Sequence, residues 1–108
     1  MSCQLALKVY RLTEKFPQHE IFGITSQMRR SAVSIASNIA EGAGRQSSKE
    51  FLNFLSIALG SLFELQTQFY LSKNLGYGGA ELSENLDKEM RGLACGLNSF
   101  IASLRRSP

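Results

Sequence analysis

Proline, cysteine and histidine are scarce in this chain, and tryptophan is absent. The 108 residues include two prolines, two cysteines and one histidine. So few prolines argue against a fold of many short strands, which needs frequent turn residues. Hydrophobic residues make up 44% and charged residues 19% of the sequence, a balance typical of a globular protein rather than a disordered one. We therefore expect one folded domain over residues 1–108.

The few cysteines and the one histidine form no catalytic or metal-binding pattern. Cys3 and Cys95 lie near opposite ends of the chain, without a Cys-x-x-Cys or Cys/His cluster, so no zinc site is predicted. His19 lies in a loop beside Glu20, which does not support a Ser-His-Asp or Cys-His site. No Glu-x-x-His motif is present, which argues against a di-iron bundle. We predict no catalytic residue, no metal, no cofactor and no enzymatic activity.

Signals for nucleotide binding, secretion and membrane insertion are also missing. The glycine-rich residues 42–45 lack the third glycine of a dinucleotide fingerprint and the Gly-Lys-Ser/Thr of a P-loop. No basic segment followed by an apolar one marks a secretory signal. The longest uncharged runs, 51–63 and 92–104, are too short to cross a membrane. We expect a cytoplasmic protein with free thiols and no membrane partner.

Apolar residues recur every three or four positions in four segments, which predicts four amphipathic helices. The first begins almost at the N-terminus and ends near Pro17. The second begins near residue 24, with Thr25 or Ser26 as its N-cap, and glycines 42 and 44 end it in a left-handed conformation. The apolar stripes of these two helices are Leu5, Val9, Leu12 and Phe16, and Ile24, Met28, Ala32, Ile35 and Ile39.

The third and fourth predicted helices are longer. Ser47 and Glu50 have capping-box spacing, and Gly76 ends the third helix. The fourth begins near Ser83, with acidic residues at its start and arginines at its end, as the helix dipole favours. Their apolar stripes are Phe51, Leu55, Ala58, Leu62, Leu65 and Phe69, and Leu86, Met90, Leu93, Leu97, Phe100 and Leu104. Four such helices joined by short connectors predict an all-α, up-and-down antiparallel four-helix bundle.

The third helix carries more apolar surface than a four-helix bundle of this size buries. Its apolar arc covers roughly 240°, whereas a surface helix needs little more than 100°. Either this helix is the most central of the four, or the apolar surface that the bundle does not bury forms a subunit interface. The candidate interface residues are Phe54, Ile57, Leu59 and Phe63. The fourth helix has a row of small residues, predicting a close helix contact within the bundle or between subunits: Gly92, Gly96, Ser99 and Ser103.

The second helix carries a polar row and the main local positive charge. Arg30, Ser34, Asn38 and Glu41 are spaced four, four and three residues apart, so their side chains share one face. This row is either a hydrogen-bonded network that fixes helix register or a surface for a ligand or an RNA backbone. Arg29, Arg30 and Arg45 are candidate phosphate contacts, because guanidinium groups bind phosphate bidentately; alternatively they are merely solvated.

One long stretch of the sequence resembles a known family. Residues 25–42 (TSQMRRSAVSIASNIAEG) resemble the signature of the small bacterial four-helix proteins called 23S rRNA-intervening sequence proteins. The similarity continues through further short motifs and covers about residues 5–105: Gly44-Arg45, Lys49-Glu50-Phe51, Phe54-Leu55, Ala58-x-Gly60-Ser61, Glu64-Leu65-x-Thr67-Gln68 and Leu75-Gly76-Tyr77.

The resemblance implies a four-helix protomer assembled as a homopentamer, with no established enzymatic activity. It also implies similarity to the accessory protein of diversity-generating retroelements, a basic pentamer that binds a reverse transcriptase and nucleic acid. Two departures stand out. The family usually has proline where this chain has Ala36, so the second helix is expected to be straighter. Family members also usually begin about ten residues earlier, so the first helix is expected to be short and to leave part of the core less covered.

Two functional hypotheses follow. The first is a non-enzymatic oligomeric scaffold that gathers Arg29, Arg30 and Arg45 into a basic surface for RNA or DNA. The second is a protein-interaction or purely structural oligomer, in which the apolar flank of the third helix recruits a protein partner.

Overall fold

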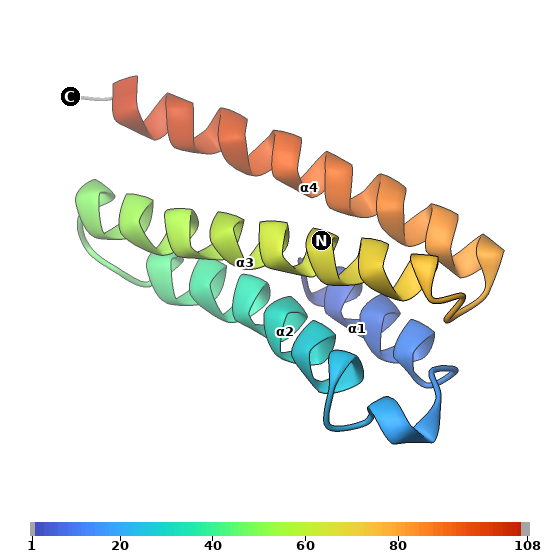
Figure 1. The fold of residues 1–108 in the computed structure, drawn as a ribbon. Coiled ribbons are helices and arrows are strands. Elements are labelled where there is room, and N and C mark those ends of the chain that lie inside the picture. The colour runs from blue at the N-terminus through green and yellow to red at the C-terminus, as the bar shows by residue number, and fades with distance from the viewer. Residues whose placement is uncertain (1, 107–108) are drawn as a thin grey trace.

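The computed structural model of the protein describes residues 2–106, which form four α-helices and one short 3-10 helix. The helices are α1 (Ser2–Thr13), α2 (Ile24–Ala43), α3 (Ser48–Asn74) and α4 (Ala80–Arg106), and the 3-10 helix is η1 (Gln18–Glu20). Consecutive α-helices run in opposite directions and form an elongated bundle of 49 × 23 × 18 Å (Figure 1). The structure confirms the predicted all-α bundle.

The two ends of α3 have the predicted caps. At the N-terminus, the Glu50 backbone N–H donates to the Ser47 hydroxyl over 3.1 Å. At the C-terminus, Gly76 has a φ of 80°. The Gly76 N–H donates to the Lys73 carbonyl and the Tyr77 N–H to the Ser72 carbonyl, which is the Schellman arrangement. The length of α3 is therefore set by local sequence at both ends.

The ends of α2 differ from the prediction. The N-cap is Gly23 rather than Thr25 or Ser26, and no side chain caps the first turn. The helix continues through Gly42 to Ala43, and Gly44 has a right-handed φ of −83° instead of a left-handed one. Gly42 serves packing: a Cβ atom there would lie 2.8 Å from the Cβ of Phe54 and 2.9 Å from a ring carbon of Phe51. Only a residue without a side chain lets α2 approach α3 this closely.

The core runs along the bundle axis and contains most of the predicted stripes. Its sixteen clustered side chains are Leu5, Val9, Leu12, Phe16, Met28, Ala32, Ile35, Leu55, Leu62, Leu65, Phe69, Leu86, Met90, Leu93, Leu97 and Ile101. Two predictions for α4 are wrong. The helix begins at Ala80 rather than near Ser83, and Ile101 takes the place of Phe100 in its buried stripe, while Phe100 is 43% exposed. Leu104 packs against the core as predicted. A helix of 3.6 residues per turn drifts away from a strict seven-residue repeat, so the stripe shifts by one position.

The first helix is short, as expected. It has 12 residues, whereas α3 and α4 have 27 each, so it covers only part of the bundle. Beyond its N-terminus, the rings of Phe51 and Phe100 pack edge-on at 5.4 Å. Leu97 and Ile101 are still 95% buried, so three helices suffice to cover the core here. The second helix runs unbroken through Ala36, where the family pattern has proline.

Gly92 and Gly96 of α4 do not make a close contact inside the bundle. Gly92 and Gly96 are exposed, and a Cβ atom at either position would meet no other atom within 4 Å. Ser99 and Ser103 are exposed as well. The other predicted role of this row, a close helix contact between subunits, stays a prediction.

Candidate interaction site

The three candidate arginines do not form one cluster. Arg29 and Arg30 lie in the first half of α2 and line the same groove, whereas Arg45 follows the end of α2 at the opposite end of the bundle (Figure 1). Each arginine also has different neighbours, so the three contribute differently to any basic surface.

The Arg29 side chain links α2 to α1. Its Nε donates to the Thr13 hydroxyl over 2.8 Å, and its guanidinium lies 4.6 Å from the centre of the Tyr10 ring. The Thr13 hydroxyl in turn donates to the Val9 carbonyl, so it is fixed in place. Arg29 therefore joins the two helices through a hydrogen bond and a cation–π contact.

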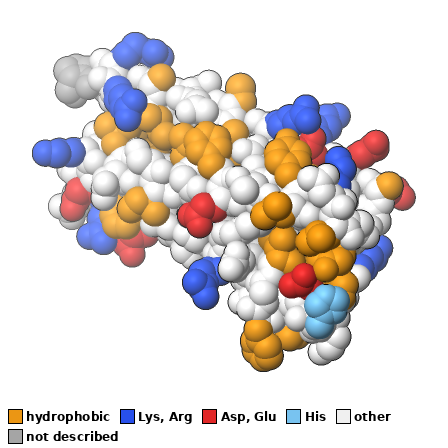
Figure 2. Space-filling model, viewed as in Figure 1, with side chains coloured by type: hydrophobic (Ala, Val, Ile, Leu, Met, Phe, Trp, Pro, Cys, Tyr) orange, Lys and Arg blue, Asp and Glu red, His pale blue; other side chains and the backbone are white. Residues whose placement is uncertain are grey.

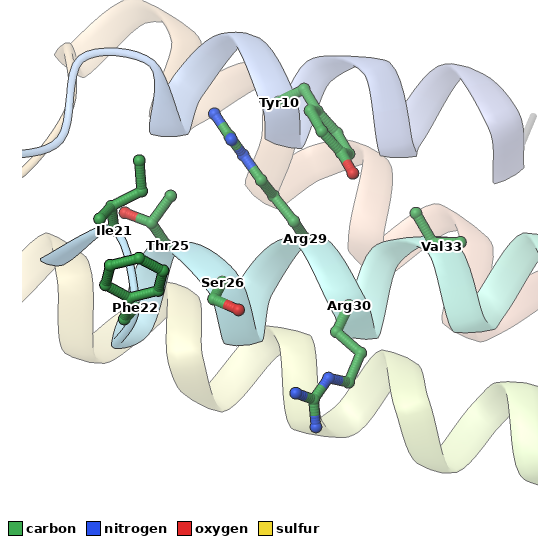
Figure 3. A pocket seen from close by; sticks show the side chains of 8 residues that line it. All are labelled: Tyr10, Ile21, Phe22, Thr25, Ser26, Arg29, Arg30 and Val33. Atoms are coloured by element: carbon green, nitrogen blue, oxygen red, sulfur yellow. The ribbon is translucent and has the colours of Figure 1, made fainter.

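Arg30 extends away from Arg29, towards α3 (Figure 3). It is exposed and makes no hydrogen bond or ion pair with any residue in the described range 2–106. Arg30 does not pair with Glu41, the carboxylate at the other end of the polar row. Of the three arginines, Arg30 is the one whose guanidinium has no hydrogen-bond or ion-pair partner within residues 2–106.

Arg45 pairs with Glu41 instead. Its Nη2 lies 3.3 Å from the Glu41 carboxylate, and its guanidinium lies 5.0 Å from the centre of the Phe54 ring. A depression of about 450 Å³ beside it is lined by Arg45, Lys49, Glu50, Asn53 and Phe54. Arg45 is therefore partly neutralised but still exposed to solvent.

The middle of the polar row joins α2 to α3. The Ser34 and Ser61 hydroxyls are hydrogen bonded over 2.8 Å. The Asn38 amide donates to the Ser34 carbonyl over 2.8 Å and to the Ser34 hydroxyl over 3.0 Å. For Ser34 and Asn38 these bonds agree with the network interpretation: the Ser34–Ser61 bond links α2 to α3, and the two Asn38 bonds hold Ser34 within α2. Arg30 and Glu41, at the ends of the row, are exposed.

A groove runs along the outside of α1 and α2, and we call it the α1–α2 groove. One part, of about 460 Å³, is lined by Tyr10, Ile21, Phe22, Thr25, Ser26, Arg29, Arg30 and Val33 (Figure 3). The other, of about 390 Å³, shares Tyr10 and Val33 and is also lined by Cys3, Ala6, Leu7, Ala36 and Ser37. Phe22 is 95% exposed at its edge. The groove is mainly apolar, and it contains two arginines and no carboxylate.

The four interface candidates on α3 divide into two kinds. Phe54 and Leu59 are partly buried; Leu59 packs against the core, and Phe54 contacts Arg45. Ile57 and Phe63 are 45% and 50% exposed. Leu71, which the sequence analysis did not single out, is 54% exposed on the same outward side of the helix. The surplus apolar surface predicted for α3 is therefore present, but only some of the named residues form it.

A second group of cations was missed because its members are distant in sequence. The C-terminal end of α4, with Arg105 and Arg106, lies at the same end of the bundle as the start of α3 and the end of α2 (Figure 1). Arg45, Lys49, Arg105 and Arg106 thus share one end of the bundle, and we call it the basic end. Figure 2 shows Lys and Arg side chains gathered there. The antiparallel order of the helices is the signal from which this convergence follows.

Two further titratable side chains, Tyr77 and His19, lie beside the Glu20 carboxylate. Tyr77 donates a hydrogen bond of 2.9 Å to Glu20, and this bond raises the pKa of the Tyr77 hydroxyl above its usual value of 10.0. His19 is exposed, with its Nε2 4.0 Å from the Glu20 carboxylate.

Within residues 2–106, no three side chains are arranged to hold a metal ion, and no helix is long and apolar enough to span a membrane.

Comparison with known proteins agrees with this architecture. A crystal structure of a Bacteroides thetaiotaomicron protein of unknown function, described as from the S23 ribosomal protein family, matches with a TM-score of 0.81. The two sequences are 27% identical, and the match covers 93% of this chain and 94% of the other. No protein of curated function matches. The model of the 23S rRNA-intervening sequence proteins matches residues 1–99, so the chain belongs to the 23S rRNA-intervening sequence protein family.

Proposed function

We propose that this protein is a non-enzymatic scaffold that assembles into a homo-oligomer and binds RNA or DNA through a basic surface formed on assembly. The observation that carries this proposal is the amount of apolar side chain left uncovered on α1, α2 and α3. Assembly would bury that surface, and the oligomer would carry the exposed cations of every protomer.

The exposed apolar side chains support assembly. Leu7, Phe22, Ile57, Phe63 and Leu71 are each between 45% and 95% exposed. A monomeric protein rarely keeps large contiguous apolar patches in water, and such patches mark interaction sites. The family resemblance implies five copies, and five chains of 11.9 kDa give a mass of about 60 kDa.

The placement of the cations supports an anionic partner. The basic end carries four cations, Arg45, Lys49, Arg105 and Arg106, against the carboxylates of Glu41 and Glu50. One chain has a formal net charge of +3, so five copies carry 5 × 3 = +15. A field of this kind attracts phosphate backbones with little dependence on base sequence.

The first experiment measures nucleic-acid affinity against salt concentration, by fluorescence anisotropy with labelled RNA and DNA oligonucleotides. We expect binding at 50 mM salt that weakens steeply by 200 mM, because counterions are released. Lys49→Ala, which removes an exposed cation of the basic end, is expected to weaken binding to all sequences and to reduce the salt dependence by about one unit. Arg91→Ala is the matched control, because Arg91 already pairs with Asp87 over 2.8 Å. Absent or salt-insensitive binding at 50 mM contradicts the proposal.

A second candidate function is recruitment of a protein partner by an apolar surface. The aliphatic lining of the α1–α2 groove favours it, because Ala6, Leu7, Val33 and Ala36 offer no side-chain hydrogen bonds to bases or phosphates. Intact assembly without nucleic-acid binding would favour this candidate over the first.

A further inference from the structure

One protomer has two uncovered apolar surfaces on different helices. The first is the α1–α2 groove, whose lining includes Leu7, Phe22 and Val33 with exposures of 58%, 95% and 43%. The second lies on the outward side of α3, opposite its buried stripe, and we call it the outer α3 face. It spans about 120° of the helix surface, with Ile57 and Phe63 at its two edges and Gly60, Glu64, Thr67 and Leu71 between them.

The two surfaces match in length and shape. Along α2, the groove extends from residue 25 to residue 37, which is about 18 Å of helix, and the outer α3 face from residue 57 to residue 71 is about 21 Å. At the centre of that face, nothing lies within 4 Å of the position of a Cβ atom on Gly60. A helix with a glycine at the middle of its contact face can enter a groove between two other helices closely.

The two surfaces also match in charge. The groove contains Arg29 and Arg30 and no carboxylate. The outer α3 face contains Glu64 and no cation, and Glu64 makes no hydrogen bond or ion pair within the described part of the chain. Opposite charges at the edge of an apolar contact fix its orientation and disfavour like-to-like pairing. Pairing two α1–α2 grooves would instead bring four arginines together.

We infer that the outer α3 face of one copy docks into the α1–α2 groove of the next copy. This inference rests on the assembly proposed above and names its interface. Such an interface joins two different surfaces, so it continues from copy to copy and closes as a ring rather than as a two-fold dimer. If the bundles stand side by side around the ring axis, every basic end lies at the same rim, where the charges of all copies add.

The test breaks each surface separately. Val33→Glu places a carboxylate in the groove, and Phe63→Glu places one on the outer α3 face; both positions are about half exposed. Asn98→Glu is the control, because Asn98 is exposed on α4 and lies outside both surfaces. Leu7→Glu, on α1, is a second groove variant. Circular dichroism shows whether each variant keeps its helices, and light scattering gives its mass.

We expect Val33→Glu, Leu7→Glu and Phe63→Glu to be folded protomers of about 12 kDa, and Asn98→Glu to keep the mass of the wild type. Each groove variant retains its outer α3 face, and Phe63→Glu retains its groove. An equimolar mixture of Val33→Glu and Phe63→Glu should therefore form a dimer of about 24 kDa that grows no further.

Two other outcomes would overturn the inference, and each would exclude a different part of the proposed interface. If folded groove variants keep the wild-type mass, the groove is not the interface and is available to a different partner. If both kinds of variant are protomers but their mixture does not pair, the two surfaces do not contact each other. Either result leaves the proposed assembly standing, whereas a wild-type mass of one protomer overturns both.

Discussion

Gly42→Ala tests the closest approach of two helices in the bundle. In the middle of a helix, alanine is about 1 kcal/mol more favourable than glycine. At Gly42, however, the new methyl group would lie 2.8 Å from the Cβ of Phe54 and 2.9 Å from a ring carbon of Phe51. Overpacking of this kind costs about 1–3 kcal/mol. Because the Phe54 Cβ is anchored to the backbone of α3, it yields less than the end of a flexible side chain.

We therefore expect Gly42→Ala to lower the free energy of unfolding by up to about 2 kcal/mol, which is the overpacking cost less the gain in helix propensity. Gly92→Ala is the control: it lies inside α4, and its Cβ atom would meet nothing within 4 Å. That variant should be more stable than the wild type by up to about 1 kcal/mol. Urea unfolding at one protein concentration, followed by circular dichroism at 222 nm, gives both values. If Gly42→Ala is stabilised as much as Gly92→Ala, the close packing of α2 on α3 is refuted.

Three further predictions test individual contacts. Arg29→Ala should destabilise the protein by about 1–2 kcal/mol in urea unfolding, because it removes a hydrogen bond and a cation–π contact, whereas Arg30→Ala should change stability by less than about 0.5 kcal/mol. Ser34→Ala should cost about 1 kcal/mol, measured the same way, because it breaks the hydrogen bond from α2 to α3. The raised pKa of Tyr77 means that the folded state holds this proton more tightly than the unfolded state, so its contribution to stability is complete below pH 10 and is lost at higher pH. The stability of the wild type should fall more steeply than that of Tyr77→Phe between pH 9 and 11; equal slopes would mean that the hydrogen bond to Glu20 is not maintained.

The sequence predicted the helices and most of the core because those features depend on local periodicity. Residues four and three apart share a helix face whatever the rest of the chain does, so the stripes of α1, α2 and α3 were found in place. The Ser47 cap is equally local. The one-position shift to Ile101 at the end of α4 shows the limit of this reasoning, because a small error in period grows over a long helix.

The interaction surfaces were harder to predict because they depend on which helices become neighbours. Arg29 has the same sequence context as Arg30, yet only Arg29 faces Thr13 and Tyr10 on α1. Arg105 reaches the basic end only because α4 runs back beside the start of α3 (Figure 1). Gly42 resembles a helix stop in the sequence, and its packing role becomes visible only when α3 is in place. These features belong to tertiary structure rather than to any single segment.

The mass of the wild-type protein in solution tests the central claim most directly. Multi-angle light scattering at low micromolar concentration and physiological salt measures it without any variant or ligand. Assembly of five chains predicts about 60 kDa. A mass of about 12 kDa would mean that the apolar side chains of the α1–α2 groove and the outer α3 face stay exposed in the free protein, and it would contradict the proposal that this protein is an oligomeric scaffold.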